Sequence, residues 1–132
     1  MQSVIRKVAD AGALVIESEL ANIDGLFPPA GEINFYRIVQ ESLNNIVKHS
    51  DAATAQITVR KMSGALTMTI ADDGKGFDYR QTMIAPQRSR GFGLTGLAER
   101  VRILGGQFAC DSAPSQGTRL NFEIPIPAKN EK

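Results

Sequence analysis

The stretch ESLNNIVKHS, residues 41–50, places four different polar groups on one side of a predicted helix. Glu41 and Asn45 are i,i+4 neighbours, and Lys48 and His49 follow them at helical spacing. A carboxylate, a carboxamide, an amine and an imidazole therefore share one side. Such a set is often only a solvated surface, but the glycine-rich motifs later in the chain favour a binding site.

The other side of the same helix is apolar. Apolar residues recur every three or four positions, which predicts a helix over about residues 31–49. The residues expected to face a core are Ile33, Tyr36, Val39, Leu43 and Ile46.

The remaining chain alternates between helical and strand patterns. Strands are predicted at residues 13–20, 54–62, 65–71, 107–111 and 118–126, and further helices at residues 3–11 and 94–104. The strands from residue 54 onward form two hairpins, and residues 74–93 read as a long polar lid. This order predicts an α+β fold. We expect a two-layer α/β sandwich, whose mixed, mostly antiparallel sheet is covered on one face by helices.

Composition limits the classes of function. The 132 residues suit one domain, residues 1–132, with a core over about 13–127 and a frayed tail at 128–132. A net charge of +1 gives no broad basic surface for nucleic acid. The single cysteine, Cys110, rules out an internal disulfide and reads as a core residue. We find no apolar run long enough to cross a bilayer and no signal peptide.

Two glycine motifs follow the first hairpin. In DDGKG, residues 72–76, the plain interpretation is an Asp-Gly turn, and the functional one is a carboxylate at a strand end with close backbone access for a planar ligand. GFGLTG, residues 91–96, matches a dinucleotide fingerprint, but the preceding PQRSR is not a strand. What remains is a glycine-rich loop before a helix N-terminus, which suits a phosphate.

Together the motifs are more specific than each alone. ExxxNxxKH on a helix, then DxGxG, GxGLxGLxERV and a GT pair in the last hairpin resemble the ATP-binding catalytic domain of sensor histidine kinases. That domain has the Bergerat fold of the gyrase, heat-shock chaperone, histidine kinase and MutL superfamily. The phrases YRIVQESLNN and GLAERV are similar to the nitrate-sensor-type subfamily, which pairs with response regulators that carry LuxR-type DNA-binding domains.

The resemblance implies a role for each matched residue. Asp72 accepts a hydrogen bond from the adenine amino group, Gly74 and Gly76 allow close approach, and Thr118 meets adenine through water. Asp73 stands where the family has asparagine.

The resemblance also implies the phosphate and metal contacts. Asn45 is the Mg²⁺ ligand, Glu41 is the catalytic acid that supports the hydrated metal or an attacking group, and Lys48 and His49 reach phosphates or ribose. The residues that close over the triphosphate are Gly91, Gly93, Leu94 and Gly96.

The implied activity is transfer of the γ-phosphoryl group of ATP, with Mg²⁺, to a histidine outside this chain, because His49 belongs to the nucleotide motif. We expect a monomeric, cytoplasmic fragment of a longer sensor kinase, with the histidine-bearing dimerisation domain and a response regulator as partners and no nucleic acid. Two alternatives stay open: a serine kinase of the anti-sigma-factor type, and a nucleotide-gated interaction module without transfer activity.

Overall fold

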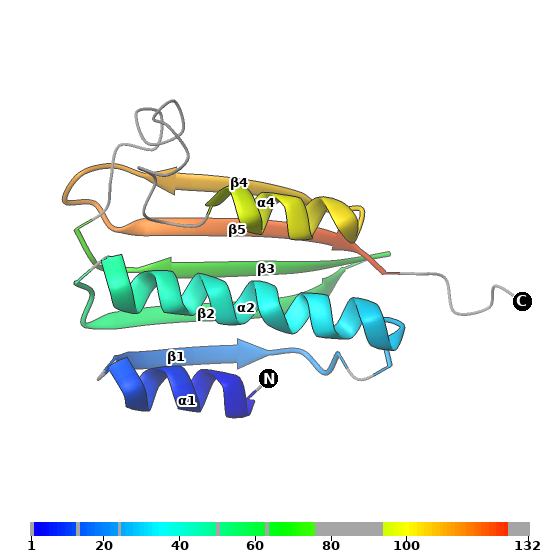
Figure 1. Cartoon of the computed structure of the whole chain (residues 1–132), viewed down its shortest axis with the longest axis horizontal. Coiled ribbons are helices and arrows are strands. Elements are labelled where there is room, and N and C mark those ends of the chain that lie inside the picture. Colours follow the sequence, from blue (N-terminus) through cyan, green and yellow to red (C-terminus); the bar gives the residue numbers. More distant parts are fainter. Residues whose placement is uncertain are drawn as a thin grey trace, which may run out of the picture.

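The computed structural model describes residues 2–12, 14–23, 25–49, 51–62, 64–75 and 94–126 (Figure 1). The elements are α1 (Gln2–Gly12), β1 (Val15–Leu20), α2 (Pro29–His49), β2 (Thr54–Met62), β3 (Ala65–Asp72), α4 (Leu94–Ile103), β4 (Gln107–Ser112) and β5 (Thr118–Pro125). The predicted lid and the predicted tail fall almost entirely outside the described residues. No helix in the described ranges is both long enough and apolar enough to cross a membrane.

The strands form one five-stranded sheet in the order β1-β2-β3-β5-β4. Strands β1 and β2 are parallel, and the other three neighbouring pairs are antiparallel. The helices lie together in front of the sheet in Figure 1. The predicted α+β sandwich with a mixed, mostly antiparallel sheet is therefore confirmed.

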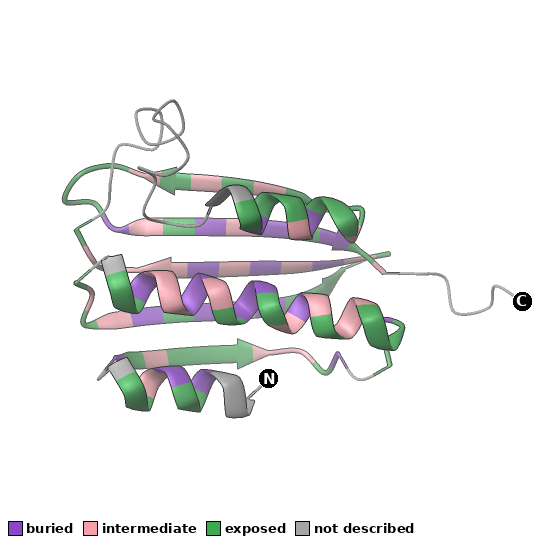
Figure 2. Cartoon of the chain, in the orientation of Figure 1, coloured by how far each residue is buried: buried purple, intermediate pink, exposed green. Residues whose placement is uncertain are grey.

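Alternation along the central strands decides which face of the sheet is buried. Leu66, Met68 and Ile70 of β3 are 0–1% exposed, whereas the threonines between them are only partly buried. Their neighbours across the sheet, such as Ile57 in β2 and Leu120 in β5, continue the same apolar layer. Figure 2 shows this buried layer on the middle strands and on α2. The opposite face carries polar and small side chains, as the hairpin pattern predicts.

The prediction for the buried side of α2 is partly wrong. Ile33 is 58% exposed. The fully buried positions, 0% exposed, are Phe35, Ile38, Val39, Ser42 and Leu43, with Ile46 at 5%. Ser42 interrupts the apolar pattern, but its hydroxyl donates to the Ile38 carbonyl oxygen at 2.7 Å and is therefore satisfied inside the core.

Helix α4 ends where the glycine pair predicts. The Gly106 amide donates to the Val101 carbonyl and the Gly105 amide donates to the Arg102 carbonyl, both at 2.9 Å. Gly105 has a φ of +78°, so this is a Schellman cap with glycine in the left-handed position. The cap fixes the direction in which the chain enters β4, and Leu97 and Val101 hold α4 against the sheet.

Candidate functional site

The described elements that carry motif residues meet at one end of the sandwich. Asp72 is the last residue of β3 and Thr118 is the first of β5. At the same end, α2 finishes at His49 and α4 begins at Leu94 (Figure 1). Segments that are far apart in the sequence thus have their ends at one place.

Asp72 and Thr118 are direct partners across the antiparallel β3–β5 pair. Directly opposed residues in such a pair project from the same face of the sheet. Their neighbours Ile70 and Leu120 face the core, and alternate residues share a face, so this pair lies on the helix-covered side. Thr118 is also opposite Ser112 of β4, and the two hydroxyl oxygens are 2.8 Å apart.

The Asp72 carboxylate is half-buried and accepts a hydrogen bond of 2.7 Å from the Gly74 amide. Burial raises the pKa of Asp72 above its ordinary value, and the Gly74 bond opposes that rise in part. The carboxylate is therefore held at the strand end, where a hydrogen-bond donor on a ligand would restore part of the solvation that it has lost.

A cavity of about 460 Å³ adjoins this pair and is lined by residues 71–72, 111–113 and 116–119. It lies where the ends of β3, β4 and β5 meet. The turn between β4 and β5 approaches the segment that follows β3: the Ser115 amide donates to the Lys75 carbonyl oxygen. The cavity borders Asp72 and Thr118, and it also borders Ala71, Asp111 and Arg119, which lie on the opposite face of the sheet.

Asp73 has a structural role that the sequence analysis missed. Its Oδ1 accepts from the amides of Ala53 and Thr54 at 3.0 and 3.1 Å, and its Oδ2 accepts from the Thr54 hydroxyl at 2.8 Å. Chiefly the bonds from Thr54 lower the pKa of Asp73, although the carboxylate is exposed. Asp73 thus fastens the end of β3 to the segment that follows α2. The Asp73-Gly74 pair at the end of a predicted strand was the available signal.

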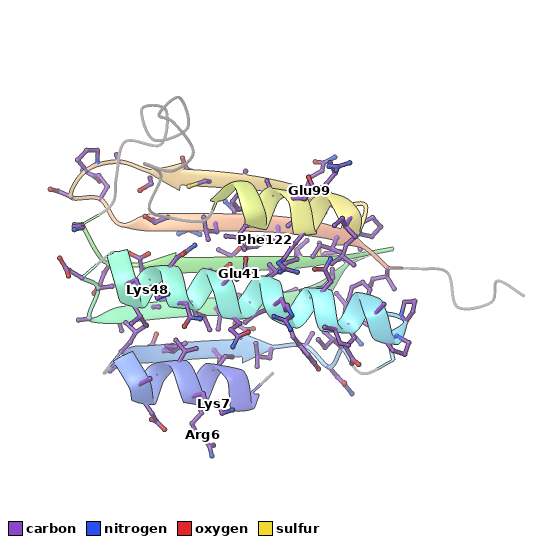
Figure 3. All side chains as sticks on the ribbon, in the orientation of Figure 1. Arg6, Lys7, Glu41, Lys48, Glu99 and Phe122 are labelled. Atoms are coloured by element: carbon purple, nitrogen blue, oxygen red, sulfur yellow. The ribbon has the colours of Figure 1, made fainter. Side chains whose placement is uncertain are left out.

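Glu41 is bonded to Arg100, another partner that the sequence analysis missed. Arg100 Nε donates to Glu41 Oε2 at 3.2 Å, and the Arg100 guanidinium also donates to Asn34 Oδ1 at 3.1 Å. Figure 3 shows Glu41 on the side of α2 that faces α4, whereas Glu99 points away. Arg100 lies beside buried Leu97 and Val101, and a cation so near a core needs a partner.

The other predicted residues are placed to different degrees. Asn45 is half-buried in the last turns of α2, and Lys48 is exposed close to its C-terminal end (Figure 3). The backbones of His49 and Leu94 are described, but their side chains are not. Gly96 is exposed in the first turn of α4, and beyond its chain neighbours and the backbone of its own helix no described atom lies within 4 Å of an added Cβ. The predicted site residues Gly76, Gly91 and Gly93 lie outside the described residues.

The helix ends at this site have opposite polarity. A helix N-terminus, such as that of α4, carries a partial positive charge, which favours a phosphate. The C-terminus of α2 carries a partial negative charge, which favours a cation. Asn45 offers one carbonyl oxygen, and Mg²⁺ is commonly held by one or two protein ligands together with phosphates and water. The residues present therefore fit a nucleoside triphosphate with Mg²⁺.

Cys110 lies two residues before Ser112 in β4, opposite Leu120, and packs against the core. It is half-buried, not fully buried as predicted, and burial raises the pKa of its thiol to about 12. The thiol is consequently protonated and unreactive at neutral pH. No group of three or more His, Cys, Asp and Glu side chains in the described ranges is placed to hold a metal ion.

Comparison with known proteins identifies the family. The sequence profile of the histidine kinase-, DNA gyrase B- and HSP90-like ATPases matches residues 30–128. The chain belongs to this ATPase family. The match contains Glu41, Asn45, Asp72, Gly74 and Thr118, and it leaves out α1 and β1.

Curated relatives of this ATPase domain are sensor kinases. One is the signal transduction histidine-protein kinase/phosphatase DegS of Brevibacillus brevis, 37% identical over 100 residues that cover 76% of this chain and 25% of DegS. Another is the sensor histidine kinase YxjM of Bacillus subtilis, 28% identical over 133 residues, which cover 100% of this chain and 31% of YxjM. The chain thus spans less than a third of either relative.

Solved structures confirm the fold. The blue-light activated histidine kinase of Erythrobacter litoralis EL346 superposes with a TM-score of 0.77 at 20% identity. The superposition covers 95% of this chain and 40% of that kinase. At this identity the similarity shows the fold alone.

Proposed function

We propose that this chain is the ATP- and Mg²⁺-binding catalytic domain of a two-component sensor histidine kinase. The observation that carries the proposal is the pairing of Asp72 with Thr118 at the end of the sheet where α2 finishes and α4 begins. The family match and the sensor-kinase relatives support it.

The base end of the site is formed by the strand ends. Asp72 is proposed to accept a hydrogen bond from the adenine amino group, with Gly74 and Gly76 admitting the base close to the backbone. Thr118, which shares a face with Asp72, is proposed to contact the base through water. A carboxylate acceptor at this point favours adenine over guanine, because guanine presents a carbonyl oxygen where adenine presents an amino group.

The triphosphate end is formed by the helix ends. Asn45 is proposed as the protein ligand to Mg²⁺, and Lys48 and His49 as phosphate or ribose contacts. Gly91, Gly93, Leu94 and Gly96 are proposed to bring backbone N–H groups to the phosphates at the start of α4. Bound Mg²⁺ neutralises charge on the transferring group. Glu41 is proposed to orient the attacking group or a metal-bound water.

The acceptor and the regulator lie outside this chain. We propose that one ATPase domain, residues 1–132, transfers the γ-phosphoryl group to a histidine on a dimerisation domain of a longer cytoplasmic or membrane-bound kinase. The phrases YRIVQESLNN and GLAERV support the nitrate-sensor-type subfamily, and hence a response regulator with a LuxR-type DNA-binding domain.

Isothermal titration calorimetry with ATP and GTP tests the binding half of this proposal. We expect ATP to bind in the presence of Mg²⁺ and GTP to bind at least tenfold more weakly. Equal affinity for the two nucleotides would contradict the assignment of Asp72 as the base-recognition residue. No binding of either nucleotide would contradict the proposed function itself.

A further inference from the structure

Arg100 joins α4 to α2 through two partners. Its Nε donates to Glu41 Oε2 at 3.2 Å, and its guanidinium donates to Asn34 Oδ1 at 3.1 Å. The Asn34 amide in turn donates to the Arg100 carbonyl oxygen at 3.1 Å. Asn34 thus bonds both the backbone and the side chain of Arg100. The same guanidinium also bonds Glu41.

The guanidinium projects from a rigid element. Leu97 and Val101, on either side of Arg100 along α4, are 0% and 1% exposed. The side chains of Arg100 and Glu41 are 34% and 40% exposed, so the pair is partly shielded from water. Because Arg100 lies on a packed helix and is also bonded to Asn34, its guanidinium has little freedom. It therefore restricts the Glu41 carboxylate to which it is bonded.

The hydrogen bond and the ion pair between Arg100 and Glu41 both involve one carboxylate oxygen, Oε2. An unrestrained glutamate side chain samples several rotamers, and restricting it beforehand removes that entropy from the binding and transfer steps. Arg100 therefore supplies orientation without occupying the whole carboxylate.

We propose that Arg100 is a positioning residue for Glu41, holding Oε2 so that Oε1 is presented to the nucleotide in one orientation. This inference rests on the proposed function, in which Glu41 orients the attacking group or a metal-bound water. It adds a residue of α4, the helix that follows the proposed phosphate loop, to the machinery carried by α2. Arg100 acts through Glu41 and does not contact the nucleotide.

The test measures phosphoryl transfer to the histidine-bearing helices of the parent protein, added in trans, at saturating ATP. Arg100→Ala is expected to lower the transfer rate on the order of tenfold, because a small misplacement of a positioned group is costly. The Kd for ATP should change less than twofold. Arg100→Lys should lose less of the rate than Arg100→Ala, since an ammonium keeps the charge but lacks the fork that reaches both partners.

Asn34→Ala is the matched control. It removes hydrogen bonds between the same two helices but leaves the Arg100–Glu41 bond in place. Its transfer rate should fall clearly less than that of Arg100→Ala, although both variants lose stability. In a Glu41→Ala background, Arg100→Ala should lower the rate no further.

Three results would overturn the inference: a wild-type rate in folded Arg100→Ala, equal losses in Arg100→Ala and Asn34→Ala, or a further loss in the Glu41→Ala background. If Arg100→Ala does not fold, a wild-type rate in Arg100→Lys overturns it. An unsubstituted chain that binds ATP and transfers phosphate but is insensitive to Arg100 contradicts this inference alone. An unsubstituted chain that transfers nothing contradicts the proposed function, and this inference with it.

Discussion

A Cβ atom at Gly117 would lie 2.3 Å from the carbonyl oxygen of Asp72, so the turn before β5 meets the end of β3 only because residue 117 lacks a side chain. Gly117 also has a φ of +76°, a conformation that L-residues adopt with strain. The position of Thr118 opposite Asp72 therefore depends on its neighbour. The sequence shows only a common glycine-threonine turn at this point.

Substituting Gly117 should disturb both stability and binding. We expect Gly117→Ala to lower the free energy of unfolding by about 2 kcal/mol or more, from the left-handed backbone and the clash together. Gly64→Ala is the matched control, since Gly64 has a φ of +73° but nothing within 4 Å of an added Cβ. Denaturant unfolding and ATP titration of both variants provide the comparison. Equal destabilisation would show that the contact with Asp72 contributes nothing.

Replacing Asp72 by asparagine should weaken ATP binding and raise the stability of the fold near neutral pH. Asp72→Asn should weaken ATP binding by about 1.5–3 kcal/mol, the strength of a hydrogen bond to a charged group.

The raised pKa of Asp72 means that its ionised form is disfavoured in the folded chain. Its contribution to stability is therefore full below the ordinary pKa of 3.8 and is lost as the pH rises through the folded value.

Urea unfolding across a pH series measures this effect. Asp72→Asn should match the unsubstituted chain near pH 3 and become the more stable of the two near neutral pH, where the buried carboxylate is ionised. An Asp72→Asn variant that is less stable than the unsubstituted chain at neutral pH would contradict the account of a desolvated carboxylate.

Asp73 should show the opposite pH dependence. Its pKa is lowered by the bonds from Thr54 and Ala53, so its contribution to stability is present above the ordinary pKa of 3.8 and is lost as the pH falls through the folded value. Asp73→Ala should lower the melting temperature at neutral pH, and the difference should shrink in acid. Asp10→Ala, at an exposed position on α1, is the control. A pH-independent loss would assign the effect to packing.

The proposed metal ligand can be tested against its neighbour. Asn45→Ala should abolish the dependence of ATP affinity on Mg²⁺, because the carbonyl oxygen that suits this ion is gone. Asn44→Ala removes the adjacent carboxamide, also half-buried in α2, and should leave that dependence intact. Calorimetric titration of ATP with and without Mg²⁺ distinguishes the two. An unchanged response to Mg²⁺ in Asn45→Ala would exclude Asn45 as the ligand.

Local patterns predicted much of the fold. The period-two alternation located β2 and β3, predicted at residues 54–62 and 65–71, because each strand buries only one face. Helical spacing placed Ile33 on the core side of α2, whereas the structure exposes it. The buried side of α2 includes Ser42, whose hydroxyl donates to a carbonyl oxygen of the same helix. The sequence alone does not distinguish such a buried serine from one that is exposed to water.

The contacts that build the site were less predictable because they join distant segments. Arg100 and Glu41 are 59 residues apart, and Asp73 is 19 or 20 residues from its partners. Sequence motifs identified Asp72 and Thr118 as site candidates, and the register of β3 and β5 makes them neighbours. The pairing of Arg100 with Glu41 depends on how α4 packs on α2, and the periodicity of the sequence does not specify that packing.

The most direct test of the central claim is transfer of radiolabel from γ-labelled ATP, with and without the parent's histidine-bearing helices. The chain alone should bind ATP yet form no stable phosphoprotein, because in-line transfer requires an acceptor nitrogen beyond the γ-phosphate. The only histidine, His49, ends the helix that carries the proposed metal ligand. Adding the helices should produce an acid-labile, alkali-stable phosphohistidine. Robust labelling of the chain alone, or an acid-stable product on the acceptor, would contradict the account.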